Sequence, residues 1–125
     1  TGEWPQNRTP RVAAMLLDGK SARDSVRLVA DQTYEATIDA FDPDSDALTY
    51  RWELKPESTA TSGGGDYEEP LPTLEGLLSD PGAATTELKS PAPGKYRLFA
   101  YAFDKHERVA HANITFLVES DAVRN

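Results

Sequence analysis

The chain has 125 residues, 38% of them hydrophobic, a size that suits one domain with a single core. Its 21 acidic residues outnumber 13 basic ones, for a net charge of −8, which argues against nucleic acid or an anionic membrane as a partner because both need clustered basic residues. The absence of cysteine excludes disulfides, thiolate catalysis and cysteine-ligated zinc, and no apolar run approaches the ~20 residues that span a bilayer.

The first third of the chain predicts short strands separated by turn residues. Residues 1–10 contain two prolines and no periodicity, so we interpret them as a linker from an upstream domain. Residues 11–17 are an apolar run that ends at a turn dipeptide. Residues 25–29 form a second short apolar run, and residues 34–40 alternate apolar and polar side chains. Strict alternation predicts a half-buried strand.

The clearest strand of the chain is predicted at residues 48–54. Leu, Tyr, Trp and Leu alternate there with Thr, Arg and Glu, and Pro56 ends the run. Residues 57–72 are polar and contain three consecutive glycines, which predicts a long flexible loop. Residues 73–78 are compatible with either a helical turn or an edge segment.

Three more strands are predicted in the last third, at residues 85–88, 96–103 and 110–118. This makes about seven short strands with turn signals at roughly 8–12-residue spacing, the pattern of a sandwich. We therefore predict an all-β fold, an immunoglobulin-like antiparallel β-sandwich over residues 11–119, followed by a frayed tail at residues 120–125.

Two segments resemble a known module. The segment Phe-Asp-Pro-Asp-Ser-Asp-Ala-Leu-Thr-Tyr-Arg-Trp, from Phe41 to Trp52, resembles the "DPDGD-LTY-W" signature of PKD-like and cadherin-like immunoglobulin modules. The segment from Gly94 to Asp104 resembles their penultimate strand. The chain has Ser45 where those relatives carry Gly in the acidic turn. The resemblance implies a PKD-like or fibronectin III-like sandwich.

More narrowly, the whole chain resembles an accessory module at the C-terminal end of exported bacterial glycoside hydrolases that have a TIM-barrel catalytic domain. The residues that carry this resemblance are Trp4-Pro5-Gln6-Asn7-Arg8-Thr9-Pro10, Leu17-Asp18-Gly19-Lys20, Gln32-Thr33-Tyr34, Pro56-Glu57-Ser58 and Tyr96-Arg97-Leu98-Phe99. The resemblance implies that residues 1–10 join the module to its catalytic domain. The start of the chain is polar and carries no signal peptide, so the chain is either cytoplasmic or a fragment of a larger protein. The resemblance favours the fragment and implies an exported parent protein (periplasmic, cell-surface or secreted).

The acidic turn allows two interpretations. Asp42, Asp44 and Asp46 place a carboxylate at every second position, and calcium is a hard cation that takes ~6–8 oxygen ligands. A calcium site would need further oxygens, for which Asp104 or Glu107 of the neighbouring hairpin, backbone carbonyls and water are the candidates. The alternative is an Asx-type turn, in which Asp side chains accept backbone hydrogen bonds and Pro43 presets φ.

An unusual feature is predicted at residues 96–103. If the inward set is Tyr96, Leu98, Ala100 and Ala102, then Phe99, Tyr101 and Phe103 face outward, because side chains alternate along a strand. Small residues would then face in and large ones out. On the same outward face we expect four polar residues from the neighbouring strands: Arg51, Glu53, His111 and Asn113.

This outward aromatic set has three possible explanations. An adjacent catalytic domain or the long loop covers it, since contiguous exposed aromatics mark interfaces. Alternatively, the rings stack on a sugar while the polar neighbours bind its hydroxyls, or the register is different. Trp52 and Tyr96 point to structural roles instead, as a core tryptophan and a tyrosine-corner-like residue.

Catalysis has little support in the sequence. His106 and His111 are the only histidines, no serine lies in a Gly-x-Ser-x-Gly motif, and Asp66 and Glu68-Glu69 lie in the predicted loop. We therefore expect a non-catalytic accessory module of an exported carbohydrate-active enzyme, which docks on or stabilises the adjacent catalytic domain. The alternatives are a polysaccharide-binding module that uses the aromatic face and a calcium-stiffened adhesion module.

Overall fold

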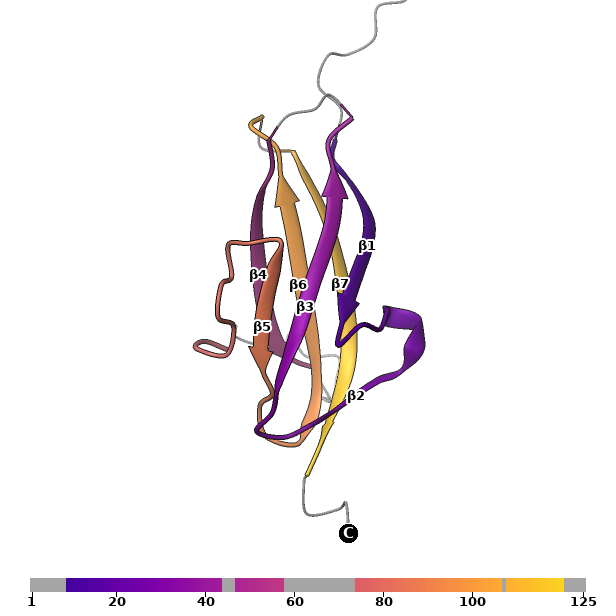
Figure 1. Ribbon diagram of the computed structural model, residues 1–125, viewed down its shortest axis with the longest axis vertical. Helices are drawn as coiled ribbons and strands as arrows, with labels where there is room; N and C mark the ends of the chain where they lie inside the picture. The colour runs from indigo at the N-terminus through magenta and orange to yellow at the C-terminus, as the bar shows by residue number, and fades with distance from the viewer. Residues whose placement is uncertain (1–8, 44–46, 58–73, 107, 121–125) are drawn as a thin grey trace, which may run out of the picture.

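Alternation of apolar and polar residues produces two stacked β-sheets (Figure 1). The computed structural model describes residues 9–43, 47–57, 74–106 and 108–120. One sheet has the order β1-β3-β5 and comprises β1 (Arg11–Leu17), β3 (Thr33–Phe41) and β5 (Thr85–Lys89). The other has the order β2-β7-β6-β4 and comprises β2 (Val26–Val29), β7 (Val109–Glu119), β6 (Gly94–Phe103) and β4 (Thr49–Pro56). The chain is therefore an all-β sandwich of seven strands, as predicted.

The core lies between the two sheets and is filled by every second residue of the strands. Its fully buried members include Leu17, Leu28, Leu54, Leu88, Leu98, Ile114, Phe116 and Val118. Burial of this apolar set, at about 25 cal/mol per Å² of apolar surface removed from water, is the main favourable term in folding.

Large inward side chains on β4 are matched by small ones on its neighbours. Trp52 pairs with Ala100 of β6, which pairs in turn with Ala112 of β7, and Tyr50 pairs with Ala102. The alanines leave room for the two aromatic rings, since interiors are packed almost without voids. The core therefore requires small inward residues on β6.

Trp52 is buried, with 3% of its surface exposed, so the prediction of a core tryptophan is confirmed. Its indole Nε1–H donates a hydrogen bond to the Ala83 carbonyl at 2.6 Å, and its backbone N–H donates to the Pro81 carbonyl at 2.9 Å. These two bonds hold the connection between β4 and β5 against the edge of β4.

Tyr96 has the structural role that the sequence predicted. Its ring stacks on Phe116 at a centroid distance of 5.7 Å, and its hydroxyl donates to the Ala92 carbonyl at 2.7 Å. A tyrosine that bonds to the backbone a few residues upstream is the arrangement of a tyrosine corner.

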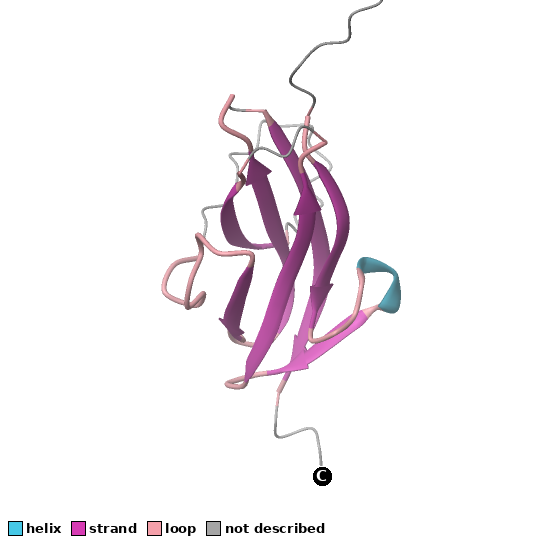
Figure 2. Ribbon diagram, turned by 45° about the horizontal axis from the view of Figure 1, so that its top comes forward, coloured by secondary structure: helices cyan, strands magenta, loops and turns pink. Residues whose placement is uncertain are grey.

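One strand pair departs from the predicted antiparallel arrangement. β2 runs parallel to β7, with Val26 opposite Phe116 and Val29 opposite Glu119. After β1 the chain passes through a 3-10 helix, η1 (Ala22–Asp24), and crosses to the other sheet, where it runs in the direction of β7 (Figure 2). The sequence analysis did not predict this helix, which is capped by a reciprocal pair of hydrogen bonds between Ser21 and Asp24.

The described part of the predicted segment 73–78 forms an edge segment and not a helical turn. Leu74 forms a β-bridge with Leu54 on β4, and Leu78 forms one with Leu88 on β5. The connection thus covers the edges of both sheets on one side of the sandwich. Covered edges are protected from pairing with other chains.

Several predicted features fall outside the described residues. They are the first eight residues of the linker, the centre of the acidic turn, nearly all of the glycine-rich loop and most of the tail. Within the described part of the chain, no helix is long and apolar enough to cross a membrane.

Two valines of β7 test the burial pattern. Val118 is 2% exposed and Val109 is 38% exposed. We expect Val118→Ala to lower the free energy of unfolding by about 1.5–3 kcal/mol, from lost transfer energy and the cavity left behind. Val109→Ala should change it by less than about 0.5 kcal/mol. Urea denaturation of both variants measures this, and equal effects would contradict the assigned core.

Candidate functional site

The predicted outward aromatics lie on the outer face of the four-stranded sheet. Ala100 and Ala102 of β6 are completely buried, whereas Phe99, Tyr101 and Phe103 are half-buried on the opposite side of the strand. The predicted register of this strand is therefore confirmed. We call these three residues the aromatic row.

The rings of the aromatic row form a continuous series along β6. The centroids of Phe99 and Tyr101 are 6.4 Å apart with planes inclined by 13°. Those of Tyr101 and Phe103 are 6.2 Å apart with planes inclined by 24°. This spacing is close to the ~6.6 Å that separates alternate residues of a strand. The backbone repeat therefore sets the positions of the rings.

The four predicted polar neighbours flank the aromatic row. Register places Arg51 and His111 on either side of Tyr101, and Glu53 and Asn113 on either side of Phe99. The imidazole of His111 lies 6.2 Å from the Tyr101 ring, tilted by 45°. The structure thus brings all seven predicted residues onto one face, while their binding role stays a prediction.

Glu53 links the aromatic row to β4. Its carboxylate accepts a hydrogen bond from the Tyr101 hydroxyl at 3.3 Å and forms an ion pair with Arg51 at 2.9 Å. Burial, together with the negative charge of Glu53, raises the pKa of the Tyr101 hydroxyl. Tyr101 therefore remains a neutral hydrogen-bond donor at physiological pH.

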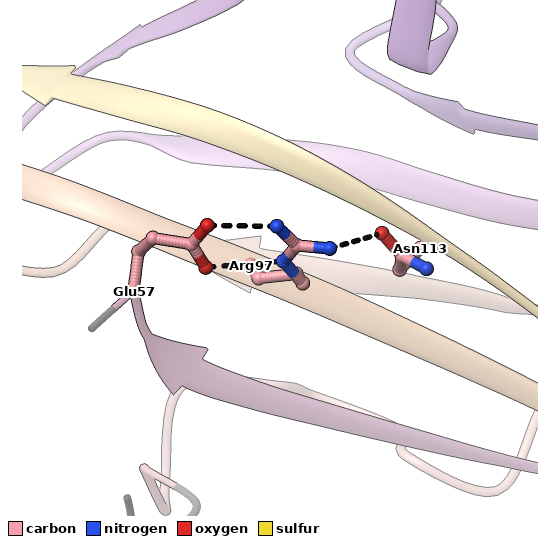
Figure 3. Close-up of polar contacts among 3 residues, drawn as sticks. All are labelled: Glu57, Arg97 and Asn113. Carbon is pink, nitrogen blue, oxygen red and sulfur yellow. Dashed lines mark hydrogen bonds and ion pairs between the residues drawn. The ribbon is translucent and has the colours of Figure 1, made fainter. Parts of the chain in front are cut away.

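The sequence analysis missed a second polar group on this face (Figure 3). The guanidinium of Arg97 donates to both carboxylate oxygens of Glu57, at 3.0 and 2.7 Å, and to the side-chain oxygen of Asn113 at 3.0 Å. A two-point bond of this kind is the strongest ion-pair geometry available to arginine. It fixes Glu57, just beyond β4, to the central strand β6.

Period-two spacing could have identified these residues. Arg97 lies two positions before Phe99 on β6, and Lys55 lies two positions after Glu53 on β4. The Lys55 ammonium is 5.8 Å from the centroid of the Phe99 ring, within the range of a cation–π contact. The polar flank therefore extends along the whole face.

This face combines ring surface with hydrogen-bonding groups that are already paired with one another. Such an arrangement is preorganised and suits non-covalent recognition, because little side-chain freedom is lost on binding. Among the described residues, the candidate site is a binding surface.

β3 and β6 terminate at the same end of the sandwich (Figure 1), and Asp42 and Asp104 directly follow them in the chain. Asp42 and Asp104 are both buried there. The Asp104 carboxylate accepts hydrogen bonds from the backbone N–H groups of His106 and Arg108, at 2.8 and 2.9 Å. Burial would raise the pKa of Asp104, but these hydrogen bonds outweigh it and hold the pKa below its ordinary value. Asp104 thus organises the β6–β7 hairpin.

The calcium hypothesis depends on residues that the structure does not describe. Asp44, Asp46 and Glu107 lie outside the described residues, and two carboxylates supply too few oxygens for calcium. No group of three or more His, Asp or Glu side chains that could hold a metal occurs in the described part of the chain. Calcium binding stays a prediction.

The Arg97–Glu57 ion pair predicts a pH-dependent contribution to stability. The hydrogen bond from Arg97 lowers the pKa of Glu57 below 4.5, with burial acting in the opposite direction. The stabilisation is therefore fully present above that value and is lost as the pH falls through the lowered pKa. A double-mutant cycle with Arg97→Met and Glu57→Gln should give a coupling of about 0.5–1 kcal/mol at pH 7, because both groups are partly exposed.

Urea denaturation of the four proteins at pH 7 and pH 3 measures this coupling. We expect it to be smaller at pH 3, because the coupling is lost as Glu57 takes up a proton while the pH falls through its lowered pKa. A coupling of equal size at both pH values would contradict the assignment of the ion pair.

The role of Asp104 can be tested by amide hydrogen exchange. Asp104→Ala removes the acceptor of two backbone amides, so the amides of His106 and Arg108 should exchange faster and the melting temperature should fall. Asp104→Asn retains an acceptor oxygen and should keep part of the protection. Asp39→Ala, at an exposed position of β3, is the control. Unchanged exchange in Asp104→Ala would show that the carboxylate does not organise the hairpin.

Comparison with known proteins gives one informative likeness. No protein-family model matches the chain, and no curated protein matches it. A solved structure of a nucleoside hydrolase-related hypothetical protein from Saccharophagus degradans, described as associated with carbohydrate metabolism, superposes with a TM-score of 0.52 at 16% identity. The match covers 92% of this chain and 26% of that one. At this identity the likeness shows a shared all-β fold, and the chain spans about a quarter of the length of the longer protein.

Proposed function

We propose that the chain is a non-catalytic, PKD-like accessory module of a larger exported carbohydrate-active enzyme. The module docks on the catalytic domain of the same polypeptide through the outer face of its four-stranded sheet. The observation that carries this proposal is the aromatic row: three rings on the outer side of β6, opposite the completely buried Leu98, Ala100 and Ala102.

The two outer faces of the sandwich differ in character. The outer face of the three-stranded sheet presents exposed polar residues along β3 and β5, namely Thr33, Glu35, Asp39, Thr85, Glu87 and Lys89. The outer face of the four-stranded sheet presents the aromatic row with Arg51 and Arg97, and also the flanking Glu53, Lys55 and Glu57. Protein interfaces are enriched in aromatic residues and arginine and depleted in lysine and glutamate. The four-stranded sheet is therefore the better docking surface.

Two observations support a partner in the same polypeptide. The structural neighbour carries this fold within a chain about four times as long, since the match covers 26% of it, and that protein is described as associated with carbohydrate metabolism. The sequence resembles accessory modules that follow a TIM-barrel catalytic domain. A contiguous, half-buried row of aromatic rings on the outside of such a module is explained if the neighbouring domain covers it.

Docking predicts that the aromatic row contributes most of the binding energy. The 125-residue chain and the catalytic domain of its parent polypeptide are produced separately, and their association is measured by calorimetry. Tyr101→Ala and Phe99→Ala should each weaken association by about tenfold or more, because central aromatic residues dominate interface energetics.

Phe41→Ala is the matched control, since Phe41 is 49% exposed and lies at the end of β3 in the other sheet. Its affinity should equal that of the original chain. Melting curves of each free variant separate lost docking from lost stability. Equal affinities for Phe99→Ala and Phe41→Ala would refute docking through this face.

A further inference from the structure

A pocket lies at the edge of the four-stranded sheet, beside the aromatic row. Its volume is about 610 Å³, within the range of ~300–1,000 Å³ typical of small-molecule sites. One wall is β4, and the opposite wall is the connection that contains Leu74, Glu75 and Pro81. Phe103, the last residue of β6, also lines it. Arg51 and Phe103 of this pocket also belong to the outer face proposed for docking, whereas its far wall lies on the β4–β5 connection.

Backbone hydrogen bonds hold the two walls together. The N–H of Leu74 donates to the Leu54 carbonyl at 2.7 Å, and the N–H of Trp52 donates to the Pro81 carbonyl at 2.9 Å. The indole of Trp52 binds the Ala83 carbonyl at 2.6 Å. Because β4 is fixed to the connection at both ends of the pocket, the pocket is preformed, as a specific binding site requires.

Glu53 is the best-positioned polar group of the pocket. Its side chain is only 16% exposed, and it is fixed by the ion pair with Arg51 and the hydrogen bond from Tyr101. A carboxylate has about four acceptor sites, so Glu53 can still accept hydrogen bonds from a ligand. Arg51 is 64% exposed and retains free N–H donors for the same ligand.

The charges and the ring on the pocket wall narrow the class of ligand. Among the described lining residues, two are acidic, Glu53 and Glu75, and one is basic, Arg51, so an anionic ligand is disfavoured. Phe103 supplies an apolar ring surface next to these groups. The ligand should therefore be uncharged, offer an apolar face to Phe103, and both donate and accept hydrogen bonds. A pyranose or furanose ring has all three properties, because its C–H face is apolar and its hydroxyls donate and accept.

We infer that the β4-edge pocket binds a unit of a neutral saccharide. The sugar ring packs on Phe103, and its hydroxyls donate to Glu53 and accept from Arg51. The inference does not depend on the docking proposal, since the binding groups belong to the module alone.

The test is a titration of the 125-residue chain with neutral tetrasaccharides of glucose, xylose, mannose and galactose, followed by amide NMR. At least one tetrasaccharide should shift the amides of Arg51, Gly76 and Gly82, which line the pocket. Glu53→Gln and Arg51→Ala should each weaken this binding by about tenfold, the effect of losing a hydrogen bond to a charged group. Glu35→Gln, an exposed acidic position on β3 of the other sheet, is the matched control and should bind normally.

Three outcomes would overturn the inference: no binding of any tetrasaccharide, shifts that map away from the pocket, or tighter binding of an anionic oligosaccharide such as tetragalacturonate. No catalytic domain is present in this titration. A negative saccharide titration therefore does not contradict the docking proposal, and a negative calorimetry result for docking does not contradict the proposed saccharide site.

Discussion

The packing of Trp52 against the alanines of the adjacent strands determines the character of both faces of the four-stranded sheet. The indole occupies the space between the sheets, and the residues opposite it on β6 and β7 are Ala100 and Ala112. A larger residue at either position would overpack the core. Since side chains alternate along β6, the large residues that flank these small inward ones, Phe99, Tyr101 and Phe103, lie on the outer face.

The outer face is organised by hydrogen bonds across strands as well as by ring packing. Arg97 connects β6 to Glu57 and Asn113, and Tyr101 connects β6 to Glu53. These hydrogen bonds give the half-buried polar side chains of this face the partners that they would otherwise have to find in water or in another molecule. The surface therefore offers its apolar rings in fixed positions, which lowers the entropic cost of binding.

The connection between β4 and β5 serves the fold and the proposed ligand site together. It bridges to Leu54 on one sheet and Leu88 on the other, which protects two sheet edges that would otherwise be open to another chain. The same segment forms the second wall of the pocket on β4. The segment that covers the sandwich edges thus also forms a concave surface. The hydrogen bonds of Trp52 hold it in place for both the edge cover and the pocket.

The alternation of apolar and polar residues was enough to predict about seven strands and the face on which the aromatic row lies, because a period of two in a strand allows only two orientations. The core role of Trp52 followed from the same periodicity. Only the tertiary structure decided the parallel pairing of β2 with β7, the Arg97–Glu57 ion pair and the β4-edge pocket. These features join residues distant in the chain, and local alternation carries no information about which strand or loop becomes a neighbour.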